Sequence, residues 1–203
     1  AMISECIDRL EAERRALRDR QRFLQKTLDR SRTLSKWLTM KDNWRVVDMP
    51  EERFYEIDVS ALFSEGGVEP EQERRMLNDL VDTGRSLIDQ GMASQMQGCY
   101  RVGLQALLEG HPEQDFHLCI CSTPFDRRHT RHTRPPGRYY QRLRCASIDN
   151  LVVSEGMLFN AYKELVDEVK EHGFIPVGDL YEQELSLYTG DITAESYTEM
   201  SIR

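Results

Sequence analysis

The sequence predicts an α+β protein in which one long N-terminal helix precedes two β-α-β-β units that share an antiparallel sheet. Three observations lead to this prediction. The first 38 residues contain no glycine or proline, and their apolar residues recur at helical spacing. Short motifs after residue 40 recur 81 to 85 positions later in the chain. Within each copy, the residue pattern changes from strand to helix and then to two strands.

The first element, from Met2 to about Leu38, is rich in helix-forming residues, and its apolar residues alternate steps of four and three. One heptad position holds Ile3, Leu10, Leu17, Leu24, Ser31 and Leu38. The companion position is more polar and holds Ile7, Arg14, Gln21, Leu28 and Ser35. A helix of this size is about 55 Å long, more than the width of a small domain. We therefore expect a homodimeric coiled coil, with a helix packed along its own domain as the alternative. The predicted dimerisation residues are Ile3, Ile7, Leu10, Leu17, Leu24 and Leu28.

The rest of the chain is predicted to be an internal duplication. The segment 50–56 (PEERFYE) recurs as 135–141 (PPGRYYQ), and 80–82 (LVD) recurs as 165–167 at the same offset of 85. The offset then falls to 82 and 81. The later pairs are Gly91 with Gly173, Tyr100 with Tyr181, and Phe116 with Tyr197. A nearly constant offset of this kind predicts a pseudo-two-fold structure.

The two repeats span 42–123 and 134–203, and each begins with a strand, at 44–59 and at 134–147. Helices follow at about 70–90 and 155–172. Two further strands close each repeat, near 95–104 and 115–123 and then 178–188 and 197–203. The basic connection 126–134 has no periodicity and is predicted to be an exposed loop. An anion site there, or metal ligation by His129 and His132, is a weaker alternative.

The charge of the chain is unevenly distributed. Lys and Arg number 27 against 35 Asp and Glu, a net charge of −8. Residues 1–40 hold ten basic and six acidic residues, a net +4, which leaves 17 basic and 29 acidic residues, a net −12, in the body. This asymmetry predicts two physical units joined near residue 40. The acidic body disfavours non-specific binding of nucleic acid and favours attraction of cations.

Several classes of protein are disfavoured by the sequence. It has no apolar run of the ~18–20 residues that cross a bilayer and no signal-peptide pattern, so we expect a cytoplasmic protein. Its five cysteines include no C-x₂-C pair, which suits reduced thiols better than a disulfide framework or a zinc site. The motifs G-x-S-x-G, H-E-x-x-H, the P-loop and G-x-G-x-x-G are all absent. We expect no cofactor, no metal and no enzymatic activity.

The helices are expected on one face of the sheet, which leaves the other face free to form a ligand cleft along the pseudo-two-fold. Along 178–188, alternation puts Glu182 and Glu184 on one face and Tyr181, Gln183 and Leu185 on the other. The more apolar set is expected to pack on the helices. Glu182 would then point toward the free face.

The chain resembles the C-terminal part of MerR-family transcription activators, which carry a GyrI-like effector-binding domain. The segment 178–185 (GDLYEQEL) is similar to the closing G-x-x-Y-E strand of that family. The segment 195–202 (ESYTEMSI) is similar to its Y-x-T/V-E-I/M-x-I strand. The segment 135–139 (PPGRY) resembles its I-P-x-G-x-Y strand opening. The resemblance covers essentially the whole chain.

The resemblance implies a dimerisation helix in residues 1–40, pairing antiparallel, and a GyrI-like domain in residues 41–203. It implies the effector-sensing and dimerisation part of a MerR-type regulator. One departure is clear, because the family begins with a winged helix-turn-helix domain and nothing in this sequence can be that domain. We therefore expect the regulatory part of a longer protein, whose contacts with promoter DNA and RNA polymerase need the missing domain. A naturally short protein is the alternative.

The resemblance also implies a ligand site. In family members that sense organic cations, the Glu of the Y-E strand forms the pocket floor and a Tyr at the place of Tyr197 stacks beside it. A buried carboxylate among aromatic rings suits a lipophilic cation through charge pairing and cation–π contact. The implied ligand-binding residues are Glu182, Tyr197, Phe116 and Phe159. The plainer alternatives are a solvated Glu182 and simple core packing of the aromatic residues. Other functional alternatives are a free-standing GyrI-like binding protein, a hydrolase that uses Glu182 as base with help from Tyr197, and an acidic module that binds a protein.

Overall fold

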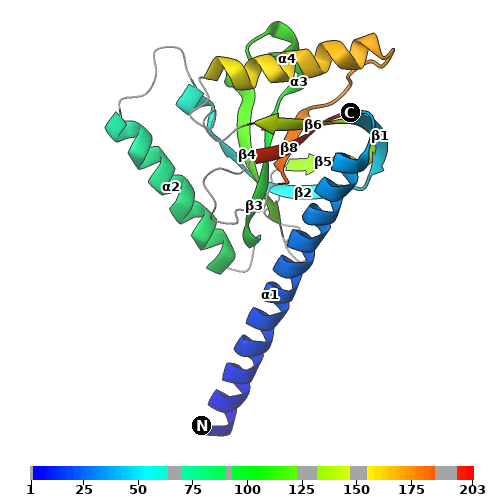
Figure 1. Cartoon of the computed structure of the whole chain (residues 1–203). Helices are drawn as coiled ribbons and strands as arrows, with labels where there is room; N and C mark the ends of the chain where they lie inside the picture. Colours follow the sequence, from blue (N-terminus) through cyan, green and yellow to red (C-terminus); the bar gives the residue numbers. More distant parts are fainter. Residues whose placement is uncertain (1, 64–69, 90–92, 123–131, 147–154, 186–195) are drawn as a thin grey trace.

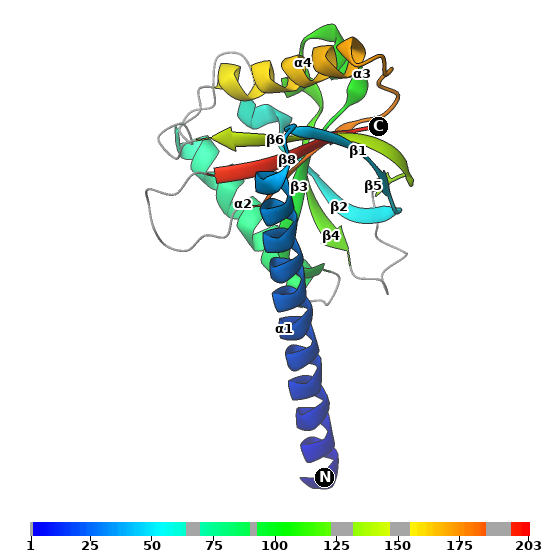
Figure 2. The same ribbon diagram turned by 45° about the vertical axis from the view of Figure 1, so that its right-hand side comes forward.

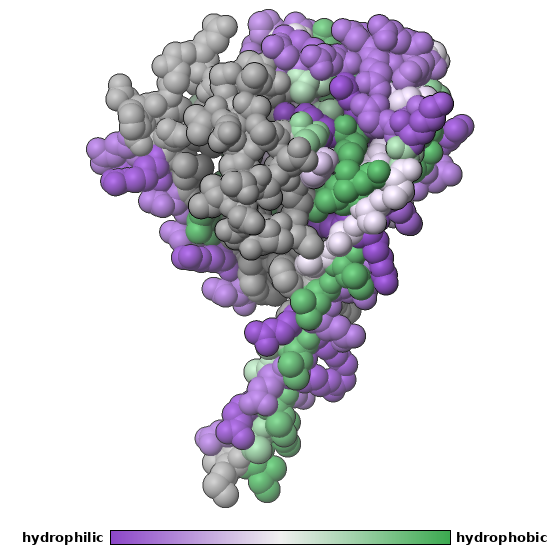
Figure 3. Space-filling model, viewed as in Figure 1, coloured by the Kyte–Doolittle hydropathy of each residue, from purple (hydrophilic) through white to green (hydrophobic). Residues whose placement is uncertain are grey.

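The long N-terminal helix α1 (Met2–Thr39) confirms the helix predicted from composition. The structure is a computed structural model of the chain that describes residues 2–63, 70–89, 93–122, 132–146, 155–185 and 196–203. Most of α1 stands clear of the body (Figure 1). Its apolar stripe, defined as Ile3, Ile7, Leu10, Leu17, Leu24 and Leu28, is exposed to solvent (Figure 3). In the described parts of the chain, no helix is both long and apolar enough to cross a membrane. The coiled coil itself stays a prediction.

Within the described residues, the strands form one eight-stranded antiparallel sheet that curls on itself (Figure 2). The sheet order is β1-β6-β8-β7-β3-β4-β2-β5. The bounds are β1 (Trp44–Met49), β2 (Glu52–Asp58), β3 (Ala93–Val102), β4 (Phe116–Ser122), β5 (His132–Arg134), β6 (Gly137–Ala146), β7 (Leu180–Glu184) and β8 (Ser196–Ile202). If β1 is exchanged with β5, β2 with β6, β3 with β7 and β4 with β8, the same order results when it is read from the other end. A two-fold axis between β3 and β7 would produce that arrangement, although the duplication stays a prediction.

Two of the predicted strands are each divided by proline. The segment 44–59 forms β1 and β2, separated at Pro50. In the segment 134–147, Arg134 ends β5, and β6 begins after Pro135-Pro136. Proline has no N–H to donate to a sheet ladder, so strands end at these positions. The predicted loop 126–134 is wrong over its last three residues, because β5 pairs with β2 and Arg134 is buried. Its residues 126–131, with His129, lie outside the described residues.

Helices α2 (Pro70–Asp89) and α4 (Glu155–Glu171) cover the same face of the sheet. From α4, Leu165, Val166 and Val169 are buried against strand residues that include Leu180 and Met200. The short helix α3 (Leu104–Glu109) and the 3₁₀ turns Ser60–Phe63 and Pro112–Asp115 were not predicted, since such short elements show no periodicity. Helix α3 ends at Gly110, whose φ of +86° favours glycine.

The last turn of α1 is fixed to the opposite face of the sheet by a cluster that we name the Trp37 anchor, made of Trp37, Arg45, Gln141 and Glu199. The Trp37 indole is buried and donates to Glu199 Oε2 at 2.7 Å. The Arg45 guanidinium lies 4.3 Å from the Trp37 ring and donates to the same oxygen at 2.9 Å. Gln141 donates to Glu199 Oε1 at 2.8 Å. The anchor fixes the end of α1 relative to β6 and β8.

Trp37→Ala is expected to lower the free energy of unfolding by about 3–5 kcal/mol, because it removes a buried indole and leaves the Glu199 carboxylate short of a donor. The adjacent Lys36 is exposed, so Lys36→Ala is the matched control, with an expected effect within about 0.5 kcal/mol. Urea unfolding at one fixed protein concentration measures both. Equal losses in the two variants would contradict the anchor.

Candidate functional site

Glu182 lies on the helix-covered face of the sheet, so the prediction that it points toward the free face is wrong. It shares its face of β7 with Leu180, beneath α4, and is only 3% exposed. The other face of β7 carries Tyr181, and Leu185 follows the strand; both are buried as well. Because both faces of this strand are covered, the alternation of its residues does not show which face lies beneath the helices.

The Glu182 carboxylate accepts hydrogen bonds at both of its oxygens. Tyr162 on α4 donates to Oε2 at 2.5 Å, and Thr198 on β8 donates to Oε1 at 2.7 Å. Arg144 on β6 brings Nη2 to 3.1 Å from Oε1 and forms an ion pair with the carboxylate. We call these four residues the Glu182 site. It is a buried carboxylate whose charge is balanced by a residue of the same chain.

Burial, and then the neighbouring Glu182 carboxylate, raise the pKa of Tyr162 well above its ordinary value of 10. Tyr162 therefore remains a protonated donor in the folded protein. In the unfolded chain the phenol ionises near pH 10, so its contribution to stability is present below that pH and is lost as pH rises further.

Tyr162→Phe removes the pH-dependent contribution of the Tyr162 phenol to the stability of the fold. The free energy of unfolding of the wild-type protein is expected to fall more steeply above about pH 10 than that of the variant, by about 1.4 kcal/mol per pH unit. Denaturant unfolding between about pH 9 and 11 measures the two slopes. Identical slopes would mean that Tyr162 ionises equally in the folded and unfolded states.

Aromatic side chains gather beside the site around Tyr162. The ring centroid of Phe116 lies 6.4 Å from that of Tyr162, and Phe159 meets Phe116 edge-on at 5.9 Å. Tyr100 stacks on Phe116 at 5.3 Å and is the register partner of Glu182 on β3. Tyr100 is 44% exposed and the Arg144 side chain 21% exposed, so solvent reaches the edges of the site. The structure thus brings together three predicted ligand residues, Glu182, Phe116 and Phe159.

Tyr197, the fourth predicted ligand residue, lies elsewhere. It pairs with Cys145 in the register of β8 and β6, while its neighbour Thr198 pairs with Arg144. Successive strand residues point to opposite faces, so Tyr197 shares the face of Glu199 and its predicted stacking beside Glu182 is wrong. Tyr162 takes that place instead. Tyr162 is not among the ligand residues predicted from the sequence.

The face of the sheet opposite α2 and α4, where the cleft was predicted, holds side chains that contact one another. The guanidinium of Arg134 lies 5.4 Å from the Tyr181 ring centroid and 5.9 Å from that of Phe54. His132 Nε2 lies 2.6 Å from the Tyr181 hydroxyl oxygen. Burial lowers the pKa of His132 and favours its neutral form. Among the described residues, no group of three or more His, Cys, Asp or Glu side chains is placed to hold a metal ion.

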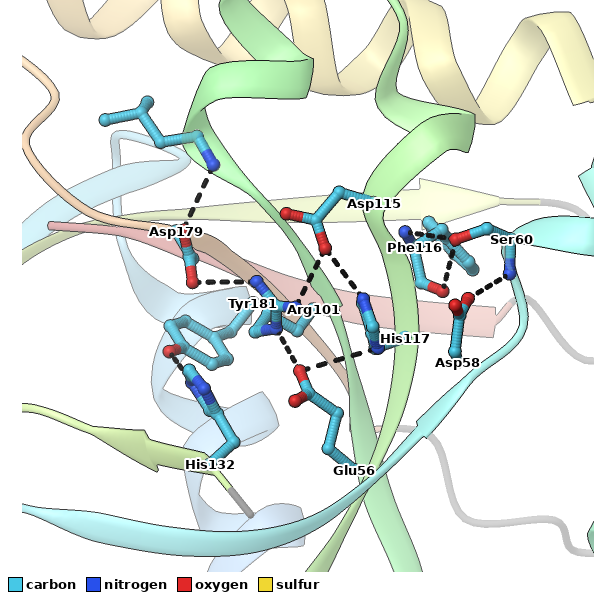
Figure 4. Close-up of polar contacts among 11 residues, drawn as sticks. Glu56, Asp58, Ser60, Arg101, Asp115, Phe116, His117, His132, Asp179 and Tyr181 are labelled. Atoms are coloured by element: carbon cyan, nitrogen blue, oxygen red, sulfur yellow. Dashed lines mark hydrogen bonds and ion pairs between the residues drawn. The ribbon is translucent and has the colours of Figure 1, made fainter.

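A second polar cluster on this face surrounds Arg101 (Figure 4). The guanidinium forms ion pairs with Glu56, with Asp115 at 2.9 Å and with Asp179 at 2.9 Å. Burial lowers the pKa of Arg101, but these three carboxylates outweigh burial and hold it above its ordinary value. Asp179 also accepts the backbone N–H of Leu104 at 3.1 Å. The cluster ties together β2, β3, the start of α3 and the segment before β7, which is a structural role.

Comparisons with known proteins add little to this geometry. No protein-family model and no curated protein matches the chain. A similar solved structure is the EcmrR–DNA complex in EcmrR-RPo, at 15% identity and a TM-score of 0.43, covering 94% of this chain and 69% of that one. A hydrolase from Listeria innocua is 11% identical with a TM-score of 0.39, covering 85% and 98%. A bacterial transcription regulation protein from Staphylococcus aureus MU50 is 5% identical with a TM-score of 0.37, covering 80% and 99%. Similarities this weak do not identify a function for this chain.

Proposed function

We propose that this chain is the effector-sensing and dimerisation part of a MerR-type transcription regulator, and that it binds a lipophilic cation at Glu182. The observation that carries the proposal is a carboxylate only 3% exposed beside the rings of Tyr162, Phe116 and Phe159. A carboxylate in such surroundings favours an organic cation over a neutral molecule of the same shape. Charge pairing with the carboxylate and electrostatic attraction to the aromatic faces act on the cation and not on its neutral isostere.

The exposed apolar stripe of α1 supports the dimerisation half of the proposal. The stripe belongs to a 38-residue helix, about 55 Å long, that stands clear of its own body. Such a stripe on a soluble helix is favourable when a second helix covers it. The partner that we propose is a second copy of the same chain, because the stripe has the heptad spacing that self-pairing requires.

Two observations favour reversible binding over hydrolysis. A hydrolase would use Glu182 as a base with Tyr197 as its assistant, but the register puts these two side chains on opposite faces of the sheet. Both Glu182 oxygens, moreover, accept hydrogen bonds from protein groups. Glu182 is better arranged to hold a charge than to activate water.

Thermal-shift measurements with pairs of quaternary ammonium compounds and their uncharged tert-butyl isosteres test the proposal. The cations are expected to raise Tm and to be recovered chemically unchanged by mass spectrometry. The proposal fails if neutral isosteres raise Tm as much as the cations, or if no cation raises it. Recovery of a hydrolysis product would favour the enzyme instead.

We predict that this chain alone does not bind duplex DNA measurably at physiological salt. Its body carries a net charge of −12 and would be repelled by the phosphate backbone. A gel-shift titration with a mixed-sequence duplex checks this expectation. Sequence-specific retention of the duplex would contradict it.

A further inference from the structure

We infer that Arg144 is an internal competitor for the effector site, which the cation must displace from Glu182 in order to bind. This inference rests on the proposed function and adds a specific mechanism to it. It begins from the ion pair in which Arg144 Nη2 lies 3.1 Å from Glu182 Oε1. The protein's own cation therefore occupies the position that a ligand cation would take.

The contacts at Glu182 Oε1 join three neighbouring strands, with Arg144 on β6, Thr198 on β8 and Glu182 itself on β7. Thr198 donates to Oε1 at 2.7 Å, while Arg144 Nε lies 3.4 Å from the Thr198 hydroxyl oxygen. Removal of the guanidinium would leave Glu182 with the hydroxyls of Thr198 and Tyr162. Those are neutral donors, so the negative charge would be free for a ligand.

The two partners of the ion pair differ in burial. The Glu182 side chain is 4% exposed and the Arg144 side chain 21% exposed. Arg144 can therefore reach water by rotating its long side chain, whereas Glu182 stays in the core. A buried carboxylate left without its cation is costly, so displacement is favourable only when another cation replaces the guanidinium. This requirement makes the site selective for cations and keeps it closed in their absence.

Only molecules in which Arg144 has left Glu182 can bind the cation. The apparent affinity is therefore the intrinsic affinity multiplied by the fraction of such molecules. Arg144→Met keeps much of the length of the side chain and removes its charge. We expect it to bind a lipophilic cation such as tetraphenylphosphonium at least about tenfold more tightly than the wild-type protein. Arg142→Met is the matched control, because Arg142 lies two residues earlier on the same face, is similarly exposed and pairs with Glu168. Its affinity should match that of the wild-type protein.

A second measurement uses the wild-type protein and does not depend on the folding of a variant. Phenylglyoxal modifies guanidinium groups that are free in solution, and peptide mapping by mass spectrometry locates the modified residues. Saturating tetraphenylphosphonium is expected to speed modification of Arg144 severalfold and to leave the rate at Arg142 unchanged.

The outcomes separate the inference from the proposed function. Tighter binding by Arg144→Met, together with faster modification of Arg144 in the presence of the cation, supports both. Cation binding that is unchanged or weaker in Arg144→Met, with no increase in modification of wild-type Arg144, overturns the inference and leaves the cation site standing. Absence of binding to both the wild-type protein and Arg144→Met overturns the proposed function, and the inference falls with it.

Discussion

Replacing Leu17 and Leu24 with lysine is expected to convert the proposed dimer into a monomer with a folded body. The two leucines are 65% and 59% exposed on α1 and belong to the apolar stripe. A dimer loses four buried leucines in this double variant, each worth about 1.5–3 kcal/mol. Four lysine charges would also lose hydration at the interface. Dimer affinity should therefore fall by more than about 1000-fold.

Sedimentation velocity measures the association state, and circular dichroism reports whether the body remains folded. Ala12→Lys with Ala16→Lys is the matched control, because it adds the same charges at exposed helix positions outside the stripe. The control should remain dimeric. A wild-type chain that sediments as a monomer at high micromolar concentration would contradict the dimer.

Glu182→Gln is expected to weaken binding of a lipophilic cation by about 30- to 1000-fold. The substitution keeps the shape of the side chain and removes its charge, and loss of a buried charge partner costs about 2–4 kcal/mol. A neutral isostere of the cation should discriminate little between the two proteins. Calorimetry with the matched pair of ligands on both proteins measures the difference.

Two further variants locate the effect within the sheet. Phe159→Ala removes one aromatic ring beside the site and should cost the cation about 1–2 kcal/mol. Tyr197→Ala removes a ring from the opposite face and should leave the affinity unchanged. Equal cation affinity in the wild-type protein and Glu182→Gln would refute the cation site, whatever the other variants do.

The elements that the sequence predicted well are those with a strong local pattern. Helix α1 lacks glycine and proline, and the sequence-based bounds of 2 to about 38 lie within one residue of its end at Thr39. Helix α4 was expected at 155–172 and spans 155–171, with Gly173 just beyond it. In contrast, the division of the segments 44–59 and 134–147 depends on prolines, and the pairing of β5 with β2 is a long-range contact.

The site was predicted only in part because its contacts join distant segments. Glu182 and Phe116 were recognised through repeat position and family resemblance, and both are buried near Tyr162. Nothing in the sequence near Arg144 points to Glu182, which is 38 positions away. Their pairing follows only once the register of β6, β8 and β7 is known. The face of β7 that carries Glu182 was predicted wrongly for a similar reason, since curling of the sheet buries both faces of this strand.

The most direct test of the central claim is the position of a bound cation. Tetraphenylarsonium carries an arsenic atom whose anomalous scattering locates the ligand in a crystal without reference to its shape. The account predicts an arsenic peak within about 6 Å of the Glu182 carboxylate and the Phe116 or Tyr162 ring, with the Arg144 guanidinium moved away from Glu182. An arsenic peak elsewhere, with the Arg144–Glu182 ion pair intact, would contradict it.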